Sequence, residues 1–479
     1  MTAQNDLALF APGTTAGDVL GWLSVGGISA PELMGAVLDR IDALNPDLNA
    51  LVSLRPRDVL MAEAAATDLS KHLGGLPIAV KDMQDTAGIT TTYGSPLFET
   101  HVPASDSALP ARLRDAGAII IGKTNTPEFG LGSHTFNPVF GATRNPYRAD
   151  RTIGGSSGGA AAALAAGLLW MADGSDMMGS LRNPAAYGNL YGFRPTWGRV
   201  PGDPSGELYL NRISTDGPMA RSVEDIARLF GVLGAADPRW PGAPWTDAGA
   251  EFDLDRDIGG TRVGWARDWS GAFPFEDGII ALCEAGLSGL IDQGAEVYQV
   301  PAPFPSERLW QSWTDLRAFS IAARRGDHLD RPETRDALKP EVIFEIEKGL
   351  SLSAMDLYQA SLTRSDWLRT AHDLFEKIDV LVLPSAQVFP FDLDMRYPTE
   401  IAGQSMDTYH RWMEVMIPAS LLGLPAISVP VGFGPEGTPM GMQLIGAPGA
   451  DRELLQVAQA YHRATLWPQA RPPKLEAAG

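Results

Sequence analysis

A segment rich in glycine and serine brings several hydroxyl groups close together in the sequence. Residues 154–159 read GGSSGG, and Ser180 follows after an alanine-rich run. Glycine at this density lets the backbone approach a ligand closely. The hydroxyls of Ser156 and Ser180 are candidates for attack on a carbonyl, but a serine hydroxyl is a weak nucleophile until a base takes its proton. The segment therefore suggests an oxyanion site, and a serine that acts as a nucleophile in it would need a base from elsewhere in the chain.

The candidate base is Lys81, which directly follows the apolar run 77–80. A lysine accepts a proton only when burial lowers its pKa enough to leave the amine neutral, and the end of a buried strand offers such burial. An isolated lysine at a strand end is more often simply paired with a carboxylate. The position of Lys81 upstream of both serine motifs favours the catalytic interpretation.

Short apolar runs alternate with helical patterns along the chain, which is typical of an α/β fold. The capping box at Ser29 predicts the start of an amphipathic helix that ends at Asn45-Pro46. A second helix is predicted over 111–116. The predicted strands are 77–80, 118–121, 379–384, 426–431 and 440–445. Lys81 is thus expected at the end of a strand.

The stretch from about 205 to 345 differs from the rest of the chain, because proline and tryptophan are dense in it. We interpret it as a variable insertion that forms the substrate pocket within a single domain of residues 1–479. Trp310 and Trp313 suit either the core or a pocket wall. The loop 128–136 is expected to supply further walls.

Several segments share the order and spacing of a known family. They are 76–82 (LPIAVKD), 117–125 (GAIIIGKTN), 144–146 (RNP), 154–159 (GGSSGG) and 192–196 (GFRPT). Together they resemble the amidase signature family, over residues of about 20–200 and again over about 375–460. The resemblance implies an α/β fold with a central mixed, twisted β-sheet covered by helices on both faces. It also implies amide hydrolysis that requires no metal and no cofactor.

That family uses a Ser–cisSer–Lys triad, and the resemblance assigns its parts residue by residue. Ser180 becomes the nucleophile, Ser156 the serine that relays the proton, and Lys81 the base. The resemblance further implies a cis peptide bond between Gly155 and Ser156. The acyl group of the substrate would then be carried on Ser180 until water releases it.

The resemblance also indicates where an oxyanion and the substrate would be bound. The residues expected there are Met177, Met178, Gly179, Gly155 and Ser157. Backbone N–H groups from Met177 to Ser180 are the expected oxyanion donors. Met178 stands where the family usually has glycine, so its side chain is expected near the oxyanion loop. Asp176 and Arg182 are expected to brace the serine loops by pairing.

Two other motifs match the sequence and suggest different chemistry. Residues 117–124 fit the P-loop pattern GxxxxGK(S/T), but the residues between the glycines look like a strand, and Pro127 follows instead of a helix. Residues 155–159 fit the GxSxG elbow of α/β-hydrolases, which would make Ser157 the nucleophile. That elbow follows an apolar strand, whereas 148–152 is charged and is interpreted as a loop.

The substrate is expected to be a small uncharged aryl or alkyl amide, because the variable stretch is apolar and rich in tryptophan. A carbamate (urethane) or an aryl ester offers the same carbonyl geometry and stays an alternative. The glutaminase subunit of a tRNA-dependent amidotransferase is disfavoured, since Phe344-Glu345 stands where those relatives carry arginines for glutamine. An inactive amide-binding protein is a further alternative, in which Met178 obstructs the site.

Composition narrows the partners of the protein. Lys and Arg total 38 against 58 Asp and Glu, a net charge of −20, which disfavours nucleic acid and anionic membranes. The single cysteine, Cys283, is expected in the core, and the histidines lack the spacing of a helical zinc site. No signal core follows the N-terminus. We expect a cytoplasmic monomer or homodimer whose partner is a small-molecule amide.

Overall fold

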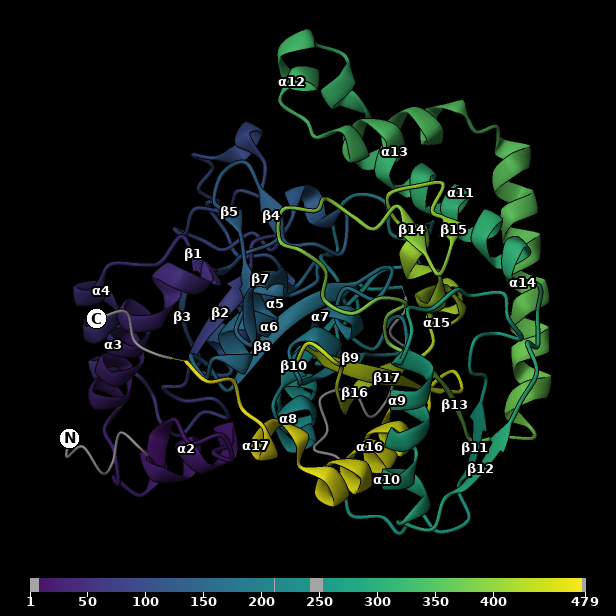
Figure 1. Ribbon diagram of the computed structural model, residues 1–479. Coiled ribbons are helices and arrows are strands. Elements are labelled where there is room, and N and C mark those ends of the chain that lie inside the picture. Colours follow the sequence, from purple (N-terminus) through teal and green to yellow (C-terminus); the bar gives the residue numbers. More distant parts are fainter. Residues whose placement is uncertain (1–7, 211, 242–252, 476–479) are drawn as a thin grey trace.

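The computed structural model describes residues 8–210, 212–241 and 253–475, and a mixed eight-stranded sheet lies at its centre (Figure 1). The strands are β8 (Met171–Asp176), β9 (Tyr191–Arg194), β10 (Thr215–Ala220), β11 (Arg262–Trp265), β12 (Glu296–Gln299), β13 (Val380–Pro384), β16 (Ala426–Phe433) and β17 (Pro439–Gly446). Their order is β12-β11-β13-β17-β16-β9-β10-β8. β11 is parallel to β12 and β13, and the other neighbouring pairs are antiparallel.

A second sheet of three strands carries the candidate base. It consists of β1 (Leu51–Val52), β3 (Ile119–Thr124) and β2 (Pro77–Lys81), in that order. The apolar runs predicted at 77–80 and 118–121 are confirmed as strands, but they pair with each other and not with the central sheet. β2 lies against β8. The end of β2 therefore lies close to β8, which contains Ser175 and is followed by Ser180.

Helices cover the central sheet on both faces. α7 (Arg182–Tyr187) packs on β16 and β17 from one side, while α9 (Ile279–Gly286) and α16 (Asp451–Thr465) pack on them from the other. The α/β fold with a covered mixed sheet, expected from the sequence, is confirmed. The other helices are α2 (Ala16–Ser24), α3 (Ala30–Leu48), α4 (Arg57–Ala66), α5 (Ala108–Asp115), α6 (Gly158–Ala165), α8 (Val223–Leu233), α10 (Ser288–Ile291), α11 (Ser306–Arg325), α12 (Pro332–Asp336), α13 (Pro340–Ser351), α14 (Ala354–Phe375), α15 (Ile417–Leu422) and α17 (Trp467–Ala470).

Short elements complete the chain around this body. The 3₁₀ helices are η1 (Pro96–Phe98), η2 (Glu128–Gly130), η3 (Gly326–Leu329) and η4 (Arg411–Met416). The two-stranded ladders pair β4 (Phe136–Asn137) with β5 (Gly141–Ala142), β6 (Arg144–Asn145) with β7 (Arg148–Thr152), and β14 (Glu400–Ile401) with β15 (Gln404–Ser405). The expectation of a loop at 148–152 is therefore wrong, because β7 closes a hairpin with β6.

The predicted end of the first long helix is also wrong. α3 runs through Pro46 to Leu48 and stops at Asn49, which adopts a left-handed conformation with φ 51°. Pro46 has no N–H to donate to the carbonyl of Asp42, so the last turn of α3 lacks that hydrogen bond. The side-chain oxygen of Asn45 accepts the N–H groups of Ala50 and Leu51 at 3.0 and 2.8 Å, and this holds the chain as it leaves the helix.

The described residues of the stretch 205–345, which we expect to be variable, contribute to the central sheet. It supplies β10, β11 and β12 of the central sheet, and β10 lies between β8 and β9. It also supplies α11, which packs against α13 and α14 on the side of the molecule away from both termini (Figure 1). A Cβ at Gly349 of α13 would lie 2.2 Å from the carbonyl oxygen of Ala318, so glycine permits this close helix contact.

Several side chains left open by the sequence belong to the core. Trp310 and Trp313 of α11 are buried in an apolar cluster with Trp412, so they are not pocket walls. Cys283 is buried, as predicted. Within the described residues, no helix is long and apolar enough to cross a membrane, and no group of His, Cys, Asp and Glu side chains could hold a metal ion.

Candidate active site

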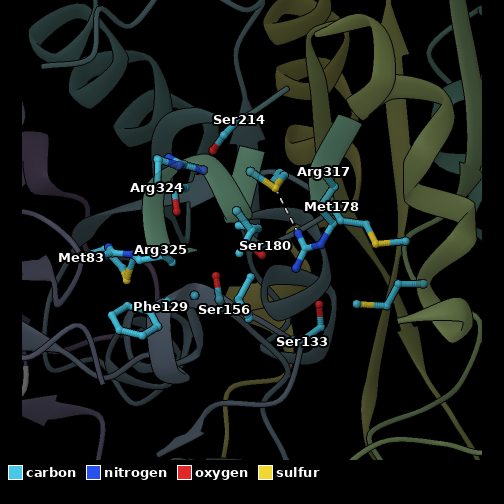
Figure 2. A pocket seen from close by; sticks show the side chains of 17 residues that line it. Met83, Phe129, Ser133, Ser156, Met178, Ser180, Ser214, Arg317, Arg324 and Arg325 are labelled. Atoms are coloured by element: carbon cyan, nitrogen blue, oxygen red, sulfur yellow. Dashed lines mark hydrogen bonds between the residues drawn. The ribbon is translucent and has the colours of Figure 1, made fainter. Parts of the chain in front are cut away.

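Four polar side chains meet where the ends of β2 and β8 come together. Lys81 at the end of β2 donates to the hydroxyl oxygens of Ser156 at 2.8 Å, Ser157 at 3.0 Å and Ser175 at 3.0 Å. Ser180 follows β8 and shares a cavity with Ser156 (Figure 2). We call the side of this cavity formed by Ser156, Ser175 and Ser180 the serine wall. Lys81 lies behind it, fully buried.

Burial of Lys81 lowers the pKa of its amine to about 8, although the negative charges of Asp173, Asp216 and Asp176 oppose the shift. Asp173 accepts the backbone N–H of Lys81 at 3.0 Å, and burial raises the pKa of its carboxyl to about 7. Such a lysine is neutral in an appreciable fraction of molecules near neutral pH. It can therefore take a proton from the hydroxyl that it contacts.

Glycine shapes the turns that carry the serines. The peptide bond between Gly155 and Ser156 is cis. Gly159 starts α6 so close to β3 that a Cβ there would lie 2.1 Å from the backbone nitrogen of Asn125. Gly179 has φ +83°, and a Cβ there would lie 2.5 Å from the side chain of Met416. These positions explain why the hydroxyls are embedded in glycine-rich sequence.

Asp176 anchors the loop that precedes Ser180. Its carboxylate pairs with Arg182 at 3.0 Å and with Arg194 at 3.1 Å, and all three side chains are fully buried. Burial alone would raise the pKa of Asp176, but the two guanidinium groups outweigh it and hold that pKa well below its usual range. Asp176 and Arg182, expected from the sequence to brace this loop, are thus paired.

The backbone donors of the loop are not all available to an oxyanion. The N–H of Gly179 donates to Asp176 at 2.8 Å, which corrects the expectation that Gly179 is an oxyanion donor. Among the described residues, the N–H groups of Met177, Met178 and Ser180 have no hydrogen-bond acceptor. Met178 keeps a negative φ and is buried, so the loop accommodates its β-carbon without backbone strain.

Gly155 and Ser157 do not line the cavity, which corrects their expected role in substrate contact. The N–H of Gly155 donates to Asn183 at 3.2 Å. Ser157 is fully buried; its hydroxyl accepts from Lys81, and its N–H donates to the carbonyl of Ser180 at 3.3 Å. A side chain held behind the wall has no access to a substrate carbonyl. The elbow interpretation of Ser157 therefore has no support in the geometry.

The cavity in front of the serine wall measures about 110 Å³, which suits a small substrate. The loop predicted to form walls does so, through residues 129–133. Thioether side chains form much of the remaining surface, and their flexible chains fill irregular space. The methionines that line the cavity are Met83, Met177, Met178 and Met413.

Part of the cavity lining is cationic, which sequence reasoning missed. Arg317, Arg324 and Arg325 of α11 line the cavity, and we call these three residues the arginine wall. In the view of Figure 2, Arg317 lies on one side of Ser180, and Arg324 and Arg325 lie on the other. Their spacing of seven and eight residues places them on one face of a helix. This spacing is the sequence feature that indicates the arginine wall, and it belongs to no known motif.

Arg317 is held rigidly within this wall. It donates to Glu345 at 2.6 Å and to the hydroxyl of Tyr409 at 2.8 Å, and it is buried. Its remaining amino group points to the sulfur of Met177 at 3.0 Å, which is a weak acceptor. Phe344 and Glu345 themselves do not line the cavity.

The fold and the site together define an enzyme that cleaves amide C–N bonds. The chain belongs to the amidase family, whose model matches residues 32–455. It is 35% identical to a glutamyl-tRNA(Gln) amidotransferase subunit from Roseiflexus castenholzii, over 93% of this chain and 94% of the relative. Among solved structures, a bacterial aryl acylamidase of the amidase signature family is similar with a TM-score of 0.88 and 27% identity, over 96% of this chain and 99% of the other. 6-Aminohexanoate cyclic dimer hydrolase is similar with a TM-score of 0.86 and 26% identity, over 97% and 99%.

Proposed function

We propose that this enzyme hydrolyses the C–N bond of a small linear amide through an acyl-enzyme on Ser180. The observation that carries the proposal is the contact of 2.8 Å between the buried amine of Lys81 and the hydroxyl of Ser156, in a cavity that Ser180 also lines. A lysine with a lowered pKa supplies the base that a serine nucleophile needs.

In the proposed reaction, the oxygen of Ser180 attacks the carbonyl carbon while its proton passes to Ser156. The proton of Ser156 passes in turn to neutral Lys81. The free N–H groups of Met177, Met178 and Ser180 are the donors for the oxyanion. When the C–N bond breaks, the proton returns from Lys81 through Ser156 to the leaving amine. Water then attacks the acyl-enzyme by the same route and releases the acid.

Covalent labelling with a fluorophosphonate tests this proposal without knowledge of the substrate. The reagent should label Ser180, and the peptide that carries the label can be identified by mass spectrometry. Failure of the parent enzyme to react would instead support an inactive amide-binding protein. A hydrolysis screen of anilides, primary amides, carbamates and aryl esters then ranks the leaving groups. A carbamate or ester presents the same carbonyl, so a rate for it above that of every amide would replace the amide as the substrate.

The glutaminase subunit of an amidotransferase is the second candidate, because the identity of 35% to an amidotransferase subunit extends over 93% of the chain. Glutamine carries an ammonium group beside its carboxylate. Among the described residues, however, no Asp or Glu lines the cavity to bind an ammonium group. We therefore place this candidate second. An assay of glutamine hydrolysis by the isolated chain separates the two, since turnover comparable to that of simple amides would favour the glutaminase.

A further inference from the structure

Two residues of the arginine wall, Arg324 and Arg325, differ from Arg317, whose charge is paired with Glu345. Arg324 donates to the carbonyl and hydroxyl oxygens of Ser320 on its own helix, at 3.2 and 3.0 Å. Arg325 lies over the rings of Phe129 at 4.3 Å and Tyr93 at 5.6 Å. Within the described part of the chain, neither arginine forms an ion pair, and Arg325 donates no hydrogen bond. The N–H groups of the Arg325 guanidinium, and those of Arg324 that do not bond to Ser320, are therefore available to a ligand.

Among the described residues, no carboxylate pairs with Arg324 or Arg325. No Asp or Glu is among the described residues that line the cavity. The carboxylates whose charges act on Arg325 are those of Asp85 and Glu128, and both accept hydrogen bonds from other residues. Asp85 accepts the hydroxyl of Tyr93, and Glu128 accepts the hydroxyl of Ser95 at 2.6 Å. Arg325 is half-buried and Arg324 is exposed, and both line the cavity of a protein whose net charge is −20.

The contacts also prepare Arg325 to bind an anion. A ring face against the plane of a guanidinium orients that plane, while the N–H groups at its edge stay free. Two such N–H groups match the two oxygens of a carboxylate. Arg324 lies beside Arg325 on the same side of the cavity, with Ser180 between them and Arg317 in the view of Figure 2. A substrate can thus place one end on the arginines and its amide carbonyl at the serine wall.

From this arrangement we infer that the preferred substrates are small amides that carry a carboxylate, which Arg324 and Arg325 bind. The inference rests on the proposed function, because it names the substrate class of the same site. It replaces the expectation of an uncharged substrate, which relied on tryptophans that lie in the core. The carboxylate belongs either to the acyl part or to the amine part of the substrate, and both sources offer the same group to the wall.

Matched substrate pairs test the inference and separate the two sources. Glutaramic acid against pentanamide compares an acyl-side carboxylate with a neutral chain, and N-benzoylglycine against N-propylbenzamide does so for the amine side. In one of the pairs, kcat/KM for the anion should exceed that for the neutral amide by about 10- to 100-fold. Equal values in both pairs would overturn the inference while leaving amide hydrolysis by Ser180 intact.

Substitutions assign the preference to the wall. Arg324→Gln and Arg325→Gln should each reduce the ratio of anionic to neutral kcat/KM by about 10-fold, mainly through KM. Arg331→Gln removes an exposed arginine that does not line the cavity and serves as the matched control. An unchanged ratio in Arg324→Gln and Arg325→Gln, or an equal fall in the control, would overturn the assignment.

Binding to the Ser180→Ala variant separates this inference from the proposed function. Calorimetry with glutaramic acid, N-benzoylglycine and their neutral partners measures recognition without turnover. Tighter binding of an anion, lost in a variant that also carries Arg325→Gln, supports the inference even if another residue were the nucleophile. Equal affinity for the anions and the neutral amides overturns it even if Ser180 is labelled.

Discussion

The two walls of the cavity differ in whether the charged side chains beside them form ion pairs. Behind the serine wall, Asp176 is fully buried and satisfied by Arg182 and Arg194. On the arginine wall, Arg324 and Arg325 form no ion pair with any residue in the described ranges. Paired, buried charges fix a geometry, since a lone charge there would be too costly. Unpaired charges at a cavity surface are instead available to a ligand. The contrast separates the groups that position the chemistry from those that select the substrate.

The largest predicted effect tests the serine wall itself. Ser180→Ala removes the attacking oxygen, so kcat should fall by about 10⁴- to 10⁶-fold while the variant stays folded. Steady-state kinetics and circular dichroism check both parts. Ser157→Ala should still react with a fluorophosphonate, because Ser157 does not face the cavity. Labelling that persists in Ser180→Ala but is lost in Ser157→Ala would show that the nucleophile has been assigned to the wrong serine.

A second prediction concerns the cost of leaving charge unpaired behind the serine wall. Asp176→Asn leaves Arg182 and Arg194 buried without their carboxylate, so the free energy of unfolding should fall by about 3–5 kcal/mol. Denaturant unfolding measures this loss. Asp379→Asn breaks an exposed pair with Arg262 and should cost clearly less. Equal losses of unfolding free energy in Asp176→Asn and Asp379→Asn would contradict the distinction between buried positioning charges and surface charges.

The pH dependence of the reaction sharpens the role of Lys81. Because the pKa of Lys81 is about 8, the neutral amine predominates above that pH and the ammonium form below it. kcat/KM should therefore rise through about pH 8 and level off on the alkaline side. Asp173→Asn removes a negative charge that raises the pKa of Lys81, so the acid limb should move to lower pH. Asp115→Asn, an exposed change on α5, should leave the limb in place. A limb unmoved in Asp173→Asn would contradict the electrostatic account.

The smallest predicted effect tests how the arginine wall is oriented. Phe129→Leu removes the ring face beneath Arg325, and the preference for a carboxylate-bearing amide should fall by about 2- to 5-fold. Phe129→Tyr keeps a ring in the same place and should retain most of the preference. Kinetics on glutaramic acid and pentanamide measure the ratio. If both variants behave alike, the ring face has no part in orienting the guanidinium.

The two walls also differ in how far the sequence predicts them. Lys81, Ser156 and Ser180 lie in short motifs. The glycines of these motifs and the apolar strand before Lys81 can be recognised in the sequence. Arg324 and Arg325 lie in a helix without a motif, and their position depends on how α11 packs against α13 and α14. The fold shows the same division. The apolar strands are predictable from their composition, whereas β10, with Asp216, Gly217 and Pro218 inside it, carries no strand pattern and owes its place to pairing with β8.

The wrong predictions for Gly179 and Ser157 have the same cause, because the role of each residue depends on tertiary structure. The hydrogen bond from the Gly179 N–H to Asp176 depends on a turn that the sequence does not predict. Ser157 is adjacent to Ser156 and also contacts Lys81, yet it does not line the cavity, because it lies at the start of α6. Adjacent residues in a turn point in different directions, and spacing alone does not tell which of them meets the cavity.

The methionines around the cavity have a consequence for how this enzyme changes over evolution. A thioether chain rotates freely and repacks around acyl groups of different outline. The surface formed by Met83, Met177, Met178 and Met413 therefore adapts its shape, while the arginines that line the same cavity select for charge. We expect single substitutions at these four positions to change which acyl groups the cavity accepts, without disturbing the buried ion pairs of Asp176.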